Sequence, residues 1–135
     1  HLMAMRNRLM LVVDDDKISR MLPGILLRPY GITVLECDNG LEALKLLDIH
    51  HVCCMLIDIS MPSFSGLELL QSILAHSKYP QMRLVAYTAD ARLGHACNFQ
   101  KLGFHQLLIK PVTAHELLAT VDFPSNSRQT RTKKD

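Results

Sequence analysis

Five short apolar runs recur along the chain, and each is followed by a segment with helical spacing. The runs occupy residues 9–13, 32–36, 52–57, 82–87 and 107–109. Apolar runs of this length, bounded by turn residues, are typical of strands buried on both faces of a parallel sheet. Alternation with helices implies crossovers that cover both faces of that sheet. The pattern predicts an α/β fold of three layers, with a doubly wound, five-stranded parallel sheet in the middle.

The spacing of apolar residues between these runs predicts five helices, at residues 17–27, 41–47, 66–75, 90–101 and 114–121. Thr113 and Glu116 form a capping-box sequence that opens the last helix. Pro23 falls inside the first helix, where it removes a backbone donor and crowds the preceding turn, so we expect a kink or a break. The fourth helix has the weakest pattern, and its residues expected to face inward are Leu93, Ala96, Cys97 and Gln100.

Length and composition fit one ordinary domain. A chain of 135 residues with 48% hydrophobic and 21% charged side chains can bury a single core. We assign residues 9–123 to this domain. Residues 1–8 are interpreted as a cloning remnant with an N-terminal lead, and residues 124–135 as a basic, disordered tail or linker. No apolar run is long enough to span a bilayer and no signal peptide is visible, so no membrane partner is expected.

Charge and cysteine usage narrow the function classes further. The nine basic and twelve acidic side chains of residues 9–123 argue against a nucleic-acid-binding surface on the domain. His50 and His51 stand beside a pair of cysteines, but neighbours on a strand point to opposite faces and cannot share one metal ion. The cysteines lack the spacing of a disulfide scaffold, which favours a reduced, cytoplasmic protein. They are Cys37, Cys53, Cys54 and Cys97.

Polar residues end four of the five apolar runs. Parallel strands bring their carboxyl ends to one edge of the sheet, so these side chains should meet there. The set comprises Asp14, Asp15, Asp58, Thr88 and Lys110. Three converging carboxylates repel one another unless a cation relieves them, and carboxylates favour Mg2+. We therefore expect Mg2+ as a cofactor, bound where phosphate oxygens can complete its coordination.

A carboxylate beside a metal and an ammonium group can act as the nucleophile in phosphoryl transfer. Such a transfer forms an aspartyl phosphate, and positioning with charge neutralisation supplies most of the acceleration. Asp58 stands alone between the acidic pair and Lys110, so it is the best candidate for the nucleophile. Lys110 supplies a compact positive charge for a phosphoryl oxygen, and the Thr88 hydroxyl a hydrogen bond.

These motifs resemble the receiver domain of a two-component response regulator, of the chemotaxis-regulator kind, over residues 9–122. The matching residues are Val12, Val13, Asp14, Asp15, Asp16, Asp58, Met61, Pro62, Gly66, Thr88, Ala89, Lys110 and Pro111. The resemblance implies a flavodoxin-like fold with strand order 2-1-3-4-5. It also implies that Asp58 accepts a phosphoryl group from a phosphohistidine. The donor would be a sensor histidine kinase or a histidine phosphotransfer protein in a phosphorelay.

The resemblance further implies a role for each site residue. Asp15 and Asp58 would bind Mg2+ directly with the carbonyl of Ser60, while Asp14 would help through water. Thr88 and Lys110 would contact the phosphoryl group, and the Lys110–Pro111 peptide bond would be cis. The chain departs from the family at three places. Leu107 replaces an aromatic residue that is common three places before the lysine. Pro23 interrupts the first helix. Ser60 and Asp90 occupy variable positions that tune phosphate lifetime.

Other functions remain open at this stage. The strand-end residues could be caps of a non-phosphorylated, doubly wound interaction module. A flavin- or nucleotide-binding module is disfavoured because its first loop is Gly- or Ser/Thr-rich, whereas this one is triply acidic. A Mg2+-dependent aspartyl-phosphate phosphatase would need a second acid two residues after Asp58, where Ser60 stands. We expect a domain that catalyses only its own phosphorylation and dephosphorylation, with the response carried by an output domain or an output partner.

Overall fold

Five parallel strands form one sheet in the computed structural model, which describes residues 8–61, 66–76, 81–92 and 98–122. The strands are β1 (Leu9–Val13), β2 (Thr33–Cys37), β3 (Cys54–Asp58), β4 (Arg83–Thr88) and β5 (Gln106–Ile109). Their order across the sheet is β2-β1-β3-β4-β5. Both the predicted α/β class and the predicted strand order are confirmed. The strands begin and end within two residues of the predicted runs, a usual uncertainty for element boundaries.

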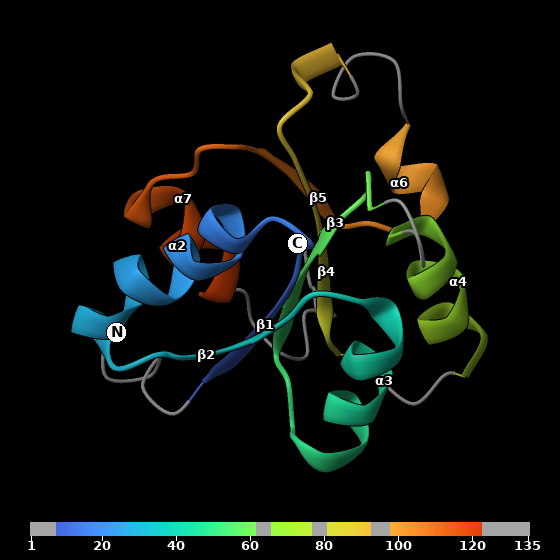
Figure 1. Cartoon of the computed structure of the whole chain (residues 1–135), viewed down its shortest axis with the longest axis horizontal. Coiled ribbons are helices and arrows are strands. Elements are labelled where there is room, and N and C mark those ends of the chain that lie inside the picture. Colours follow the sequence, from blue (N-terminus) through green and yellow to red (C-terminus); the bar gives the residue numbers. More distant parts are fainter. Residues whose placement is uncertain (1–7, 62–65, 77–80, 93–97, 123–135) are drawn as a thin grey trace, which may run out of the picture.

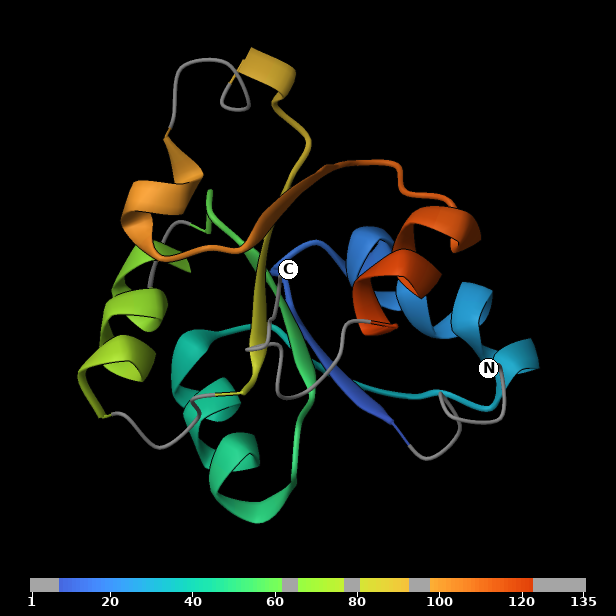
Figure 2. The same cartoon turned by 180° about the vertical axis from the view of Figure 1, so that it is seen from behind.

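Helices cover both faces of the sheet, which gives the three predicted layers (Figures 1 and 2). One face carries α2 (Lys17–Leu27) and α7 (Ala114–Val121). The other carries α3 (Gly40–Ile49), α4 (Gly66–His76) and the short α6 (Phe99–Leu102). A 3-10 turn, η1 (Arg28–Tyr30), follows α2. None of the helices among these described residues is long and apolar enough to cross a membrane.

Two apolar layers pack on the two faces of the sheet because successive strand residues point in opposite directions. In β1, Leu11 and Val13 face the layer under α3 and α4, while Met10 and Val12 face the layer under α2 and α7. Every residue of the central strand β3 is buried. Full burial of a large aliphatic side chain contributes about 1.5–3 kcal/mol to folding, so this double-sided burial anchors the sheet.

Helix α2 continues through Pro23, so of the predicted kink or break, the break is wrong. Pro23 is buried within the helix and has no N–H to donate to the carbonyl of Ser19, four residues earlier. The Tyr87 hydroxyl on β4 donates to that carbonyl instead, at 3.1 Å. A side-chain donor from the sheet therefore replaces the missing helical hydrogen bond, which helps the helix to continue.

The predicted single helix over residues 90–101 is also wrong. Asn98 has a non-helical backbone, and its side chain accepts a hydrogen bond from the N–H of Lys101, so it caps a separate helix, α6. Gln100, expected to face inward, is exposed, and Phe99 packs against the core in its place. Asparagine competes with the helical backbone for hydrogen bonds, which explains why it begins a new helix here. The other inward positions of that prediction, Leu93, Ala96 and Cys97, lie outside the described residues.

Polar caps fix the start of the helices that follow β1, β2 and β5. Asp16 caps α2, Asn39 caps α3 and Thr113 caps α7, each accepting a hydrogen bond from a backbone N–H in the first turn. The predicted capping box between Thr113 and Glu116 is present. Each cap stands a few residues beyond a strand end, so these helices begin at the same edge of the sheet as the predicted site.

Candidate functional site

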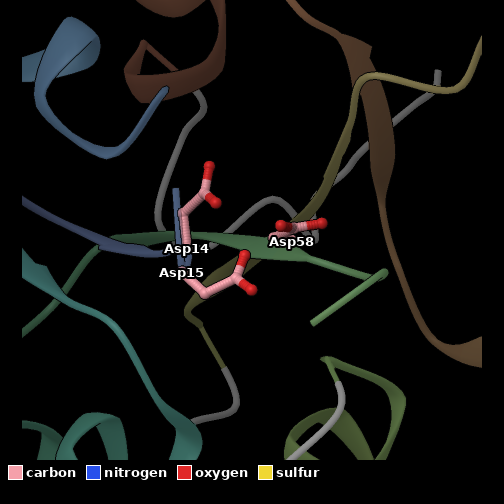
Figure 3. Close-up of side chains that lie close together, drawn as sticks. All are labelled: Asp14, Asp15 and Asp58. Carbon is pink, nitrogen blue, oxygen red and sulfur yellow. The ribbon is translucent and has the colours of Figure 1, made fainter. Parts of the chain in front are cut away.

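Three carboxylates gather where β1 and β3 end. Val13 pairs with Ile57 across the two strands, so the residues that follow them are brought together. Figure 3 shows Asp14 and Asp15 beside Asp58. One oxygen from each carboxylate lies within 4.8 Å of the other two. Asp14 and Asp58 are 0% and 3% exposed, whereas Asp15 is exposed to solvent.

The Asp14 carboxylate is held by one backbone donor and one cation. Its Oδ1 accepts from the N–H of Asp16 at 2.9 Å, and its Oδ2 accepts from Lys110 Nζ at 2.7 Å. Burial nevertheless raises the pKa of Asp14, although the hydrogen bond from Lys110 opposes that shift. The Lys110 ammonium therefore offsets only part of the cost of burying this charge.

The two oxygens of Asp58 have different neighbours. Oδ1 accepts from the backbone N–H of Ser60 at 2.9 Å and from the Ser60 hydroxyl at 2.7 Å. Oδ2 faces Lys110 Nζ at 3.6 Å. These contacts orient the carboxylate, and they place a positive charge beside the oxygen that Ser60 leaves free. Such an arrangement can stabilise added negative charge on a group attached to Asp58.

Lys110 reaches the site from the end of β5, and Thr88 ends the neighbouring strand β4. Lys110 follows β5, and its side chain is 11% exposed. Its backbone N–H donates to the carbonyl of Thr88 at 2.8 Å, which ties the ends of β4 and β5 together. Thr88 is fully buried, and its hydroxyl accepts from the N–H of Asp90 at 3.0 Å. The Lys110–Pro111 peptide bond is cis, as the resemblance implied.

The acidic group fits a hard divalent cation. Mg2+ binds oxygen ligands at about 2.0–2.1 Å in an octahedron, so its ligand oxygens lie roughly 3–4 Å apart. The three carboxylate oxygens, within 4.8 Å of one another, need only a small contraction to reach those distances. Asp14, Asp15 and Asp58 could therefore supply oxygen ligands, with the exposed side of Asp15 open to water.

Two residues near the site that the sequence analysis named lie outside the acidic group. Asp16, the third acid of the run, accepts from Ser19 N–H as the helix cap and is not part of the acidic group. That hydrogen bond is the main cause of its lowered pKa. Leu107, in the place of the family's common aromatic residue, is partly buried against the core under α3 and α4. Pro62 lies outside the described residues.

Two residues near the site were missed by the sequence reasoning. Arg20 donates to the backbone carbonyl of Asp14 at 3.0 Å, and its Nε lies 3.6 Å from Glu36. A basic residue one turn into the helix after an acidic run could have indicated this contact. The ring of Tyr87 lies beneath Lys110, with Nζ 4.8 Å from the ring centroid. Tyr87 belongs to no recognised motif. From the sequence, the residue before Thr88 is an ordinary core residue of a strand.

Comparison with known proteins agrees with this geometry. Residues 10–122 match the family model described as the response regulator receiver domain. The chain belongs to the response regulator receiver family. The receiver domain is 32% identical over 110 residues to the "Chemotaxis protein CheY homolog" of Campylobacter jejuni, covering 80% of this chain and 85% of that one. It is 31% identical over 116 residues to the "CAI-1 autoinducer sensor kinase/phosphatase CqsS" of Vibrio cholerae, covering 85% of this chain but only 17% of that kinase.

Solved structures share the receiver fold. A Francisella structure, "response regulator 1452 receiver domain", has a TM-score of 0.74 and 26% identity, with 91% of this chain and all of that chain covered. The chemotaxis response regulator CheY4 of Vibrio cholerae has a TM-score of 0.74 at 23% identity, with 85% and 96% covered, which supports the fold alone.

The family determines the broad function of this chain. It is a CheY-like receiver domain, the phosphoacceptor unit of two-component signalling. Receiver domains are signalling domains that interact with histidine kinases, rather than conventional enzymes. Neither the phosphatase nor the non-phosphorylated module considered from the sequence is favoured.

Proposed function

We propose that Asp58 is the residue that accepts the phosphoryl group. One observation carries this proposal: Asp58 is the buried strand-end carboxylate whose two oxygens face the Ser60 donors on one side and the Lys110 ammonium on the other. An oxygen of Asp58 forms a bond to phosphorus as the P–N bond of a phosphohistidine breaks, and the electron pair returns to the imidazole nitrogen. Lys110 stabilises the charge on the transferring group, and the Thr88 hydroxyl donates to one of its oxygens once it is attached.

Mg2+ is the cofactor of this proposal. Asp15 and Asp58 would bind it directly with the main-chain carbonyl of Ser60, and Asp14 would bind through water. When bound, the metal supplies positive charge that neutralises phosphoryl oxygens. The chain's own part is to hold the acids together at the ends of β1 and β3 and to keep Lys110 against Asp14.

The proposed donor is the phosphohistidine of a sensor histidine kinase or a histidine phosphotransfer protein. Two relatives are named as sensor kinases, CqsS of Vibrio cholerae and CheAY of Helicobacter pylori, and this chain spans 17% and 14% of their lengths. A cytoplasmic location is part of the proposal, since the described cysteines are free thiols, as expected in a reducing compartment. The response would be carried by an output domain or an output partner.

Incubation with a small acyl phosphate and Mg2+ should add one phosphoryl group to the wild-type protein, as measured by intact mass. The Asp58→Asn variant should take up none, because an amide is not the nucleophile that a carboxylate is. Asp48→Asn, which removes an acid on α3, should label like wild type. Equal labelling of wild type and Asp58→Asn would contradict the assignment of Asp58.

Mg2+ should raise the melting temperature of the receiver domain. Binding to the folded state alone stabilises it by about 2.7 kcal/mol at one hundred times the dissociation constant. Thermal unfolding across a Mg2+ titration in low-salt buffer measures this shift. Asp15→Asn should reduce it, whereas Asp38→Asn, an exposed acid at the end of β2, should not. A melting temperature that does not change with Mg2+ concentration would count against the metal site.

A further inference from the structure

Tyr87 is a large polar side chain buried directly beside the site. It is fully buried on β4, where it pairs with Asp58 of β3 and precedes Thr88. Its ring packs in the layer under α2 and α7, on the face of the sheet opposite to Leu107. The Lys110 ammonium lies over that ring, 4.8 Å from its centroid. The face of the Tyr87 ring thus contacts the Lys110 ammonium.

The hydroxyl of Tyr87 is fixed by an unusual acceptor. Its hydrogen bond, 3.1 Å long, goes to the backbone carbonyl of Ser19 in α2. That carbonyl would normally accept from the N–H of residue 23, but Pro23 has none. Burial and the charges of Asp14 and Asp58 raise the pKa of Tyr87, so the hydroxyl stays protonated and remains a donor. Pro23 and Tyr87 therefore act as a pair.

We propose that Tyr87 is a positioning residue that holds the Lys110 ammonium between Asp14 and Asp58 and connects it to helix α2. The inference rests on the proposed role of Asp58 as the phosphoryl acceptor. Pro23 leaves the Ser19 carbonyl without its helical donor. Tyr87 donates to that carbonyl, and its ring contacts Lys110.

The geometry explains why Lys110 needs such a support. A lysine ammonium is a point charge on a flexible stem, so its position depends on what surrounds it. Here Nζ lies 2.7 Å from Asp14 Oδ2 but 3.6 Å from Asp58 Oδ2. A cation is attracted to the face of an aromatic ring within about 6 Å of its centroid, which limits its movement toward Asp14. The hydrogen bond to Ser19 in turn fixes the orientation of the ring.

A double-mutant cycle separates positioning from simple stabilisation. Tyr87→Phe keeps the ring and removes the donor to Ser19. Pro23→Ala supplies a helical N–H to the same carbonyl. Unfolding in urea should show that Tyr87→Phe raises the unfolding equilibrium constant about fivefold in the wild-type background, and changes it little in the Pro23→Ala background.

The rate of phosphoryl labelling of Asp58 by an acyl phosphate, at saturating Mg2+, should follow a different pattern. Tyr87→Phe should slow labelling about three- to tenfold in both backgrounds. Pro23→Ala restores the helical hydrogen bond to the Ser19 carbonyl, but it does not restore the hydrogen bond that fixes the ring at position 87. Pro23→Ala alone should label within about twofold of wild type, since Pro23 touches no reacting group.

Three outcomes would overturn the inference. If Pro23→Ala restored both stability and labelling to the Tyr87→Phe protein, Tyr87 would be a structural residue only. If Tyr87→Phe labelled at the wild-type rate, the hydrogen bond from Tyr87 to Ser19 would not help to position Lys110. If wild type itself took no label at Asp58, the proposed function would fail first. Failure of the proposed function can be distinguished from failure of the inference about Tyr87, because the first two outcomes both require that the wild-type protein is labelled.

Discussion

Replacing Lys110 with methionine should slow the labelling of Asp58 by an acyl phosphate by roughly a hundredfold or more. The reason is the loss of the positive charge that lies 3.6 Å from Asp58 Oδ2, where charge accumulates during transfer. Removing one preorganised group that stabilises charge in the transition state costs about a hundred- to a thousandfold in rate. Methionine keeps much of the length and apolar character of the side chain, so the comparison isolates the charge. Quantitative intact-mass time courses measure the rate.

The same substitution should strengthen Mg2+ binding. Lys110 occupies Asp14 Oδ2 at 2.7 Å and repels a second cation. Without it, the acidic group keeps its negative charge, and calorimetry or a Mg2+ melting titration should report tighter binding. Lys101→Met, at an exposed position of helix α6, is the matched control and should change neither property. Labelling that survived in Lys110→Met, or weaker Mg2+ binding, would contradict this account of Lys110.

Gly66→Ala should destabilise the domain by about 2–3 kcal/mol and slow labelling as well. A Cβ at Gly66 would collide with the carbonyl oxygen of Asp58 and would lie 2.8 Å from the Cα of Ile59. Both contacts are with backbone, so the clash can be relieved only by moving α4 or the segment that follows Asp58. That segment includes Ser60, whose two donors hold Asp58 Oδ1. Urea unfolding and labelling time courses check the two effects.

Gly24→Ala supplies the matched control. A Cβ there would meet Val34 Cβ at 3.6 Å and Glu36 Oε2 at 3.8 Å, which are ordinary van der Waals distances. Since alanine is favoured over glycine inside a helix, this substitution in α2 should leave stability unchanged or raise it by about 0.5–1 kcal/mol. If both variants were equally stable, the close approach of α4 to the Asp58 carbonyl would not explain the glycine at position 66.

The sheet and the acidic group could be predicted because they depend on simple repeating rules. Strands buried on both faces give continuous apolar runs, and parallel pairing brings Asp14, Asp15, Asp58, Thr88 and Lys110 to one edge. Strand order came from the resemblance, since apolar periodicity is the same for every order of five parallel strands. Helix caps such as Thr113 were predictable because capping is a local interaction.

The remaining features depend on contacts between distant segments. The continuity of α2 across Pro23 could not be predicted locally, because the compensating donor lies on Tyr87 in β4. Lys110 lies closer to Asp14 than to Asp58. The spacing of residues in the sequence does not determine such side-chain distances, so this preference could not be predicted. The helix predicted over residues 90–101 was wrong because its weak apolar pattern competed with a strong cap at Asn98.

The site also joins two strands with different freedom to move. Asp58 ends β3, which has hydrogen-bonded neighbours on both sides and every residue buried. Lys110 follows β5, which pairs with β4 alone among the described strands and has only one of its four residues buried. Segments with few buried contacts open at the lowest free-energy cost. The proposed acceptor thus ends a fully buried strand, whereas Lys110 follows a strand that is mostly only partly buried. A new charge on Asp58 should therefore displace the end of β5 more readily than the end of β3.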